Sequence, residues 1–173
     1  ALREPNAYYS PGKIALLFGY FRATETAAPQ HVPGGLVFTC LSHDIIAHET
    51  THALLDGMRP LFLLPTNPDV AAFHEALADL IAILSRFRYR ELVERAFAET
   101  PPDLSSTLLT EVARQWGRSA GSGREALRRV ALDAGAPDEP VARKHRYDVR
   151  KEEHELGAVL VAAVFDAMNR VFI

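Results

Sequence analysis

The sequence predicts an α+β domain in which a small N-terminal β-sheet precedes a mostly helical remainder. Residues 1–41 alternate apolar runs with turn signals, and residues 42–100 contain two long apolar stretches with helix caps and stop signals. The 173 residues are 48% hydrophobic and 24% charged, which is ordinary globular composition and sufficient for a real core. We expect a single domain over residues 1–173, or at most two lobes around a shared cleft. The domain would be completed by an insert of helices and loops over residues 101–153 and by a C-terminal helix over residues 154–173.

The N-terminal part contains two runs that suit buried strands, residues 14–21 and residues 36–40. A turn signal over residues 10–13 precedes the first of them. Cys40 is the only cysteine of the chain, which excludes an internal disulfide. Its apolar neighbours favour a buried structural thiol over a nucleophile.

Residues 42–57 are predicted to form a helix. Ser42 is a suitable N-cap, and Asp44 places a negative charge in the first turn, where the helix dipole favours it. Gly57 and then Pro60 are stop signals. Because apolar residues occupy most sides of this segment, we expect the helix to be buried.

This helix carries the sequence His48-Glu49-Thr50-Thr51-His52. Residues four apart lie on the same face of a helix, so His48 and His52 can direct two imidazoles at one metal ion. Glu49 lies on the neighbouring flank, within reach of a water molecule that the metal activates. Burying these polar side chains is costly without partners, and a metal ion supplies them. The alternative is a chance match, although such matches usually fall on exposed, charged helices.

A second buried helix is predicted over residues 67–84, with Asn67 as its N-cap. It carries Glu75 and Asp79 four residues apart, and two carboxylates on one face of a buried helix need a compensating charge or several donors. A zinc ion can take Glu75 as its third ligand, while Asp79 accepts the free N–H of a ligating imidazole. Alternatively, arginines such as Arg86 or Arg88 form ion pairs with the two carboxylates.

The pattern D-x-x-x-H-E-x-x-H-A, followed about twenty residues later by E-A-x-x-D, resembles the gluzincin metallopeptidases, the thermolysin-like catalytic domain in particular. The resemblance implies a zincin-like fold and a zinc cofactor. It assigns His48, His52 and Glu75 as the zinc ligands. Glu49 would be the general base of peptide hydrolysis.

The same resemblance implies roles for residues around the ligands. Asp44 and Asp79 match acids that support the ligand side chains in the family. His74 stands where the thermolysin-like pattern has Asn before the ligand Glu. It either supports a ligand or competes for the metal, and Glu75 is the better ligand because Asp79 follows it at the family's interval.

The segment Asn6-Ala7-Tyr8-Tyr9 is similar to an Asn-Ala-aromatic-aromatic segment on the cleft edge of the thermolysin-like domain. By this resemblance, Asn6 and Ala7 would hold an extended peptide as an added strand. Packing of Tyr8 and Tyr9 in the sheet is an equally compatible alternative.

Near the C-terminus, an apolar helix with small residues for close packing is predicted over residues 155–165. His154 stands at its start, where thermolysin-like enzymes place the histidine that donates a hydrogen bond to the oxyanion. Glu155 and Leu156 replace the Asn and Ser that follow this histidine in the family. His145 is the competing candidate.

The insert contributes further candidates. Tyr147 is a looser candidate for steadying the oxyanion, and either Arg146 or Arg150 can bind a substrate carbonyl. Residues 104–116 and 124–134 look like two amphipathic helices joined by a glycine-rich link, without catalytic spacing.

These assignments predict a zinc metallopeptidase whose partner is a peptide or protein substrate. The alternatives are a zinc-binding regulatory module without turnover and a zinc hydrolase of a non-peptide amide or ester. The net charge of −3 gives no sign of a nucleic-acid partner, and no apolar run is long enough to span a membrane. The chain begins at Ala1 without a visible signal peptide, as expected of a processed form or part of a longer protein. The sequence does not specify the cellular compartment.

Overall fold

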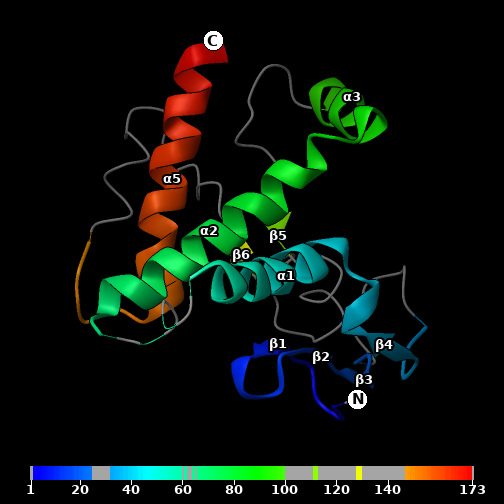
Figure 1. Cartoon of the computed structure of the whole chain (residues 1–173). Coiled ribbons are helices and arrows are strands. Elements are labelled where there is room, and N and C mark those ends of the chain that lie inside the picture. The colour runs from blue at the N-terminus through cyan, green and yellow to red at the C-terminus, as the bar shows by residue number, and fades with distance from the viewer. Residues whose placement is uncertain are drawn as a thin grey trace.

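In the computed structural model, a small β part lies beside helix α1 of a mostly helical chain, so the predicted α+β class is confirmed (Figure 1). The structure describes residues 2–24, 32–59, 61, 64, 66–99, 111–112, 128–129 and 147–172. Within these residues, the strands form three two-stranded sheets. None of the described helices is long and apolar enough to cross a membrane.

Two antiparallel pairs make up the N-terminal β part. They are β1 (Ala7–Ser10) with β2 (Ala15–Phe18), and β3 (Tyr20–Arg22) with β4 (Leu36–Phe38). The strand predicted over residues 14–21 is therefore divided, because Gly19 lies between β2 and β3. The Gly19 N–H donates to the backbone oxygen of Asn6 and to the Thr39 hydroxyl, at 2.8 and 2.9 Å. A Cβ at Gly19 would lie 2.2 Å from the backbone oxygen of Glu4, so this close approach requires glycine.

The prediction that Cys40 is a buried thiol is wrong, since Cys40 is exposed. Strand β4 ends at Phe38, and Thr39–Leu41 form a 3₁₀ turn. Thr39 takes the inward position of this turn, is 1% exposed and binds Gly19 through its hydroxyl. The next side chain, that of Cys40, consequently faces solvent.

Most of the remaining described residues lie in helices α1 (His43–Met58), α2 (Pro68–Arg86), α3 (Arg90–Glu99) and α5 (Glu153–Phe172). The helices predicted over residues 42–57 and 67–84 are confirmed within two residues at each end. Asn67 caps α2 as predicted, because its side chain accepts the N–H of Val70 at 3.1 Å.

The insert differs from its prediction where the structure describes it. Instead of helices over residues 104–116 and 124–134, β5 (Glu111–Val112) pairs antiparallel with β6 (Arg128–Arg129). The remaining positions of the two predicted helices lie outside the described residues.

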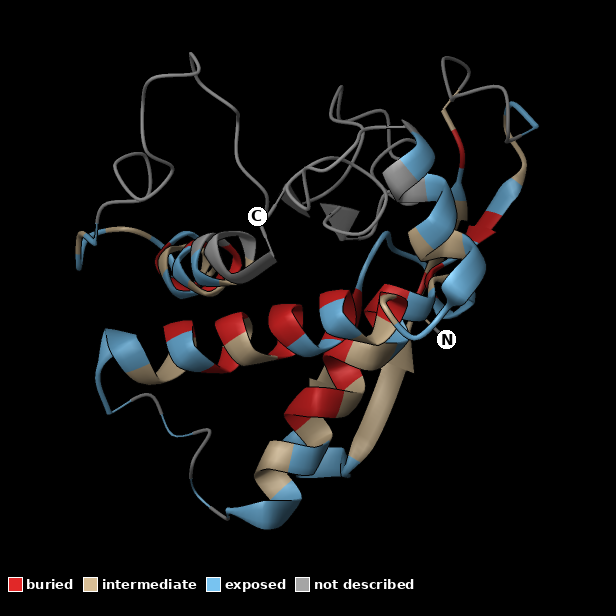
Figure 2. Cartoon of the chain, turned by 90° about the horizontal axis from the view of Figure 1, so that it is seen from above, coloured by how far each residue is buried: buried red, intermediate tan, exposed pale blue. Residues whose placement is uncertain are grey.

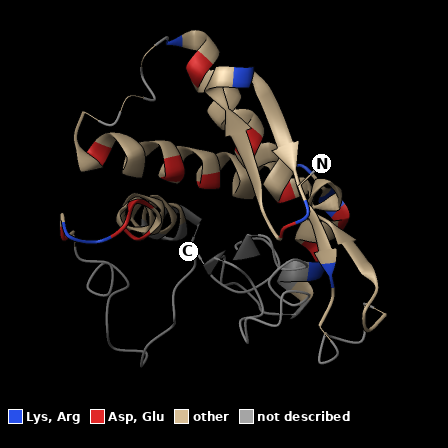
Figure 3. Ribbon diagram, turned by 90° about the horizontal axis from the view of Figure 1, so that it is seen from below, with Lys and Arg blue, Asp and Glu red and all other residues tan. Residues whose placement is uncertain are grey.

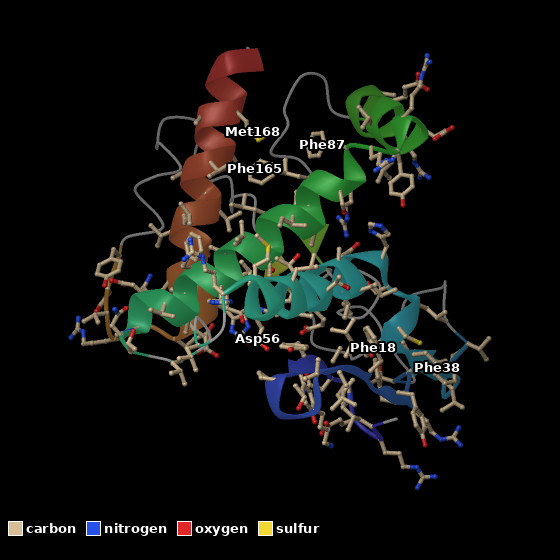
Figure 4. All side chains as sticks on the ribbon, in the orientation of Figure 1. Phe18, Phe38, Asp56, Phe87, Phe165 and Met168 are labelled. Atoms are coloured by element: carbon tan, nitrogen blue, oxygen red, sulfur yellow. The ribbon has the colours of Figure 1, made fainter. Side chains whose placement is uncertain are left out.

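The core lies where α1, α2 and α5 meet, and Figure 2 shows buried residues recurring along α2 and on the part of α1 that approaches it. Phe87 packs against this core beside α5, near Phe165 (Figure 4). Helix α1 is less buried than predicted, since Leu54 is 59% exposed. The buried core residues are Ala7, Ile45, Ala76, Leu80, Ile83, Val161 and Phe165.

Gly157 allows α5 to approach α2 closely. A Cβ at this position would lie 2.8 Å from the backbone oxygen of Ala72, 3.1 Å from the nitrogen of Ala76 and 3.3 Å from the Cβ of Glu75. The first of these distances is shorter than real Cβ contacts. The first turn of α5, which carries His154, therefore lies against the part of α2 that carries Glu75.

Replacing Gly157 by Ala should push α5 away from α2, although Ala favours helices over Gly by about 1 kcal/mol. The added methyl group must displace backbone atoms, and such overpacking typically costs about 1–3 kcal/mol. We expect a lower midpoint of urea denaturation. Gly57→Ala in α1 is the matched control, because nothing lies within 4 Å of its added Cβ. Equal stabilities of the two variants would contradict this account of the contact.

Candidate metal centre and catalytic site

Helices α1 and α2 bring His48, His52 and Glu75 together. The Nε2 atoms of the two histidines lie 3.0 Å apart. Glu75 Oε2 lies 3.3 Å from His48 Nε2, and Glu75 Oε1 lies 3.4 Å from His52 Nε2. Among the described residues, these three form a group of ligand atoms that could hold a metal ion.

The separations of these atoms fit a tetrahedral zinc site. With zinc–ligand bonds of about 2.0–2.1 Å, two ligand atoms at the tetrahedral angle lie roughly 3.3–3.4 Å apart. The observed separations of 3.0, 3.3 and 3.4 Å are close to this value. Three protein donors leave the fourth position to water or substrate, which is typical of catalytic zinc sites rather than structural ones.

Asp79 and His74 lie against the two histidines. Asp79 Oδ1 is 2.8 Å from His48 Nδ1, and a proton kept on Nδ1 by this carboxylate leaves the Nε2 lone pair to a metal. The buried His74 ring stacks on the His52 ring, with centroids 6.0 Å apart and planes at 17°. Of the predicted supporting residues, Asp79 and His74 thus lie beside a candidate ligand, Asp79 with its carboxylate oxygen next to His48 Nδ1 and His74 by ring stacking on His52.

Glu75 remains ionised although it is partly buried. Burial alone would raise its pKa, but the neighbouring imidazoles of His154, His48 and His52 together bring the pKa well below its usual range. Acidic residues recur along α2 (Figure 3), and the imidazoles are the groups that compensate the charge of Glu75. The carboxylate is therefore in the form that binds a metal ion.

Asp44, which the resemblance places beside the ligands, is bound by Arg86. The Arg86 Nε donates to Asp44 Oδ1 at 3.1 Å, and Nη2 donates to Oδ2. Both side chains are buried. This bidentate pair joins the start of α1 to the end of α2 and so fixes the crossing of the two ligand-bearing helices. The sequence suggests Arg86 as part of a solvated face or as a partner of the carboxylates Glu75 and Asp79, and the first of these predictions is wrong, because Arg86 is buried.

Replacing Arg86 by Met should lower the free energy of unfolding by about 3–5 kcal/mol, because it removes the guanidinium that compensates a buried carboxylate. Urea denaturation measures the change. Arg88→Met is the matched control, since Arg88 is exposed and surface changes usually stay within about 0.5 kcal/mol. A small effect at both positions would show that Arg86 does not stabilise the helix crossing.

Glu49 lies beside the ligands and is held by strand β1. The backbone N–H of Tyr9 donates to Glu49 Oε2 at 2.9 Å. Glu49 is 8% exposed, and this burial raises its pKa against the opposing effects of His48, His52 and the Tyr9 N–H. A raised pKa makes the carboxylate a stronger proton acceptor, which suits a general base.

His154 reaches the cluster from the first turn of α5. Its Nε2 lies 2.9 Å from Glu75 Oε2, and its Nδ1 lies 2.8 Å from Glu152 Oε2. Glu152 also accepts the backbone N–H groups of His154 and Glu155, so it caps the helix. The sequence reasoning missed Glu152. An acid just before a helix that begins with a candidate histidine was the available signal.

Within the described residues, strand β1 pairs only with β2, and its other edge faces Glu49 of α1. In an antiparallel pair, successive residues direct their backbone N–H and C=O groups alternately toward and away from the partner strand. Asn6 bonds to Gly19 through its backbone oxygen, so Ala7 and Tyr9 direct their backbone groups away from β2. The Asn6 side chain is exposed, and its Oδ1 accepts the Ala7 N–H at 2.9 Å. Of the two predicted substrate contacts, Ala7 therefore lies on the strand that touches Glu49, and Asn6 directly precedes this strand.

The remaining residues that the sequence suggests for binding the substrate or the oxyanion are Tyr147, Arg150, His145 and Arg146. The Tyr147 hydroxyl donates to Asp69 at 2.7 Å, at the start of α2. Arg150 is exposed and forms an ion pair within its own turn. His145 and Arg146 lie outside the described residues.

Comparison of the chain with protein-family models, with curated proteins and with solved structures finds no significant match.

Proposed function

We propose that this protein is a zinc-dependent peptidase of zincin-like fold in which His48, His52 and Glu75 hold the metal. The observation that carries the proposal is the buried carboxylate of Glu49, which lies on the same helix as two of three converging ligand atoms and is held by the Tyr9 N–H. A purely structural zinc site has no need of such a base and usually closes with a fourth protein ligand.

In the proposed reaction, a zinc ion in this site would polarise the scissile carbonyl and lower the pKa of a water molecule toward ~7. Glu49 accepts a proton from the attacking water at Oε1, because Oε2 is engaged by Tyr9. As the C–N bond breaks, Glu49 passes this proton to the nitrogen of the leaving amine. His154, whose Nε2 lies 2.9 Å from Glu75 Oε2, would turn this N–H from Glu75 to the oxyanion that develops on the carbonyl oxygen.

The position of β1 supports a peptide as the substrate. An extended peptide along this edge can donate an N–H to the Ala7 carbonyl and accept a hydrogen bond from the Asn6 amide group. Both residues lie two or three positions before Tyr9, which binds Glu49. A peptide bound as an added strand would therefore run past the general base.

Digestion of a mixed peptide library by the zinc-loaded protein tests this function. Mass spectrometry identifies the cleaved bonds, and Glu49→Gln protein with the same zinc content is the blank. Cleavages that appear only with the unaltered protein would establish a peptidase and show its side-chain preference. No cleavage, with zinc bound to both proteins, would overturn peptide hydrolysis by this chain and leave the non-peptide hydrolase and the zinc-binding module, which a panel of amides and esters would separate.

A further inference from the structure

Tyr9 contacts one face of helix α1 at two points. Its backbone N–H donates to Glu49 Oε2 at 2.9 Å, and its side-chain hydroxyl donates to Asp56 Oδ2 at 2.6 Å. Glu49 and Asp56 are seven residues apart, which is two helical turns, so they project from the same face about 10 Å apart along the axis. In Figure 4, Asp56 lies on the side of α1 that faces β1.

The contact between Tyr9 and Asp56 has the features of a strong hydrogen bond. Its acceptor is a carboxylate, and bonds of this charge-assisted kind are shorter and stronger than those between neutral groups. The bond to Asp56 raises the pKa of Tyr9, so the phenol stays a protonated donor. Both side chains are only partly buried, and a substitution here does not open the core.

Strand β1 belongs to a two-stranded hairpin, and such a hairpin is marginally stable without further packing. A strand that shifts along α1 would carry the Tyr9 N–H away from Glu49, whose side chain would then sample other rotamers. The bond to Asp56 opposes this shift, because it anchors the same residue two turns farther along the helix. Ala7 packs in the core at the other end of the strand.

From these contacts we propose that Tyr9 and Asp56 form a positioning pair that keeps the Glu49 carboxylate aligned for proton transfer. The inference rests on the proposed peptidase function, since it names residues that act through the general base. Neither residue touches the reacting atoms. Their effect on the reaction is through the position of the strand and of the N–H that binds Glu49.

Four variants of the full chain test the pair. Tyr9→Phe and Asp56→Ala each remove the hydroxyl–carboxylate bond, Asp56→Asn keeps an oxygen acceptor, and Tyr8→Phe makes the same chemical change on the neighbouring residue of β1. We expect kcat to fall about tenfold in the first two variants, with KM and zinc content within twofold of the unaltered protein. Asp56→Asn should keep most of the kcat of the unaltered protein, and Tyr8→Phe should leave kcat unchanged.

The double variant Tyr9→Phe/Asp56→Ala should be no slower than either single variant, because both changes break one interaction. Additive losses, or a kcat of Tyr9→Phe equal to that of the unaltered protein, would overturn the positioning pair. A rise in KM with unchanged kcat would equally overturn it and indicate a substrate contact instead.

Hydrogen exchange gives a readout that does not require turnover. The backbone amide at position 9 should exchange at least tenfold faster in Tyr9→Phe and Asp56→Ala, while the amides of α1 keep their protection. Unchanged exchange would refute the pair even if the protein proves to be no peptidase. Faster exchange in a protein that cleaves no peptide would instead show that the contact holds the strand and that the proposed function is wrong.

Discussion

Replacement of Glu49 by Gln is expected to reduce peptide turnover by about 10²–10⁴-fold, the usual contribution of a general base, while zinc binding is retained. Gln has the shape of Glu and an oxygen that can still accept the Tyr9 N–H. It cannot take a proton from water at neutral pH. The substitution therefore separates the proton transfer from the packing and hydrogen bonding of the site.

Zinc content by elemental analysis and kcat on a cleaved peptide measure the two effects separately. Glu94→Gln is the control, because Glu94 is exposed on α3 and pairs with Arg90. Turnover retained by Glu49→Gln would remove this residue from the mechanism. Zinc lost from the same variant would show that Glu49 is a ligand, which its bond to the Tyr9 backbone does not suggest.

The grouping of the ligand atoms could be predicted because it depends mostly on helix periodicity. His48 and His52 lie one turn apart in α1, as do Glu75 and Asp79 in α2, so each pair shares a face wherever the helix is placed. Only the meeting of the two faces required the tertiary structure. Burial of polar residues within apolar helices was the signal that the faces meet.

Contacts between distant segments could not be read from the sequence. Nothing local tells that the Tyr9 N–H meets Glu49, forty residues later, or that Asp56 receives the Tyr9 hydroxyl. The pairing of Asp44 with Arg86 depends in the same way on the crossing of two helices. Local patterns fix which side chains share a face, whereas packing decides which partner each face meets.

The strand predictions failed where one residue interrupts a continuous apolar run. Gly19 divides the first run, because the chain passes within 2.2 Å of the position of a Cβ there. In the second run, the hydroxyl of Thr39 turns inward to bind Gly19, which leaves Cys40 exposed. In both cases hydrogen bonds between segments override the hydrophobicity of the segment itself.

Replacement of His48 or His52 by Ala should abolish zinc binding at concentrations that saturate the unaltered protein. Each change removes one of three donors, and the two remaining ligands cannot complete a protein zinc site. In the unaltered protein, free zinc at 100 times its dissociation constant would stabilise the fold by about 2.7 kcal/mol, or about 5–11 °C in melting temperature for a chain of this size. This zinc-dependent shift should vanish in both variants.

The matched control for the histidine variants is His43→Ala. His43 belongs to the same helix but is exposed, and its Nε2 lies 3.2 Å from the Tyr89 hydroxyl, away from the three ligand atoms. It should keep both the zinc content and the melting shift. Full zinc occupancy in His48→Ala or His52→Ala would overturn the ligand assignment. Loss of the shift in all three variants would mean that the shift does not report on this cluster alone, because His43 does not belong to it.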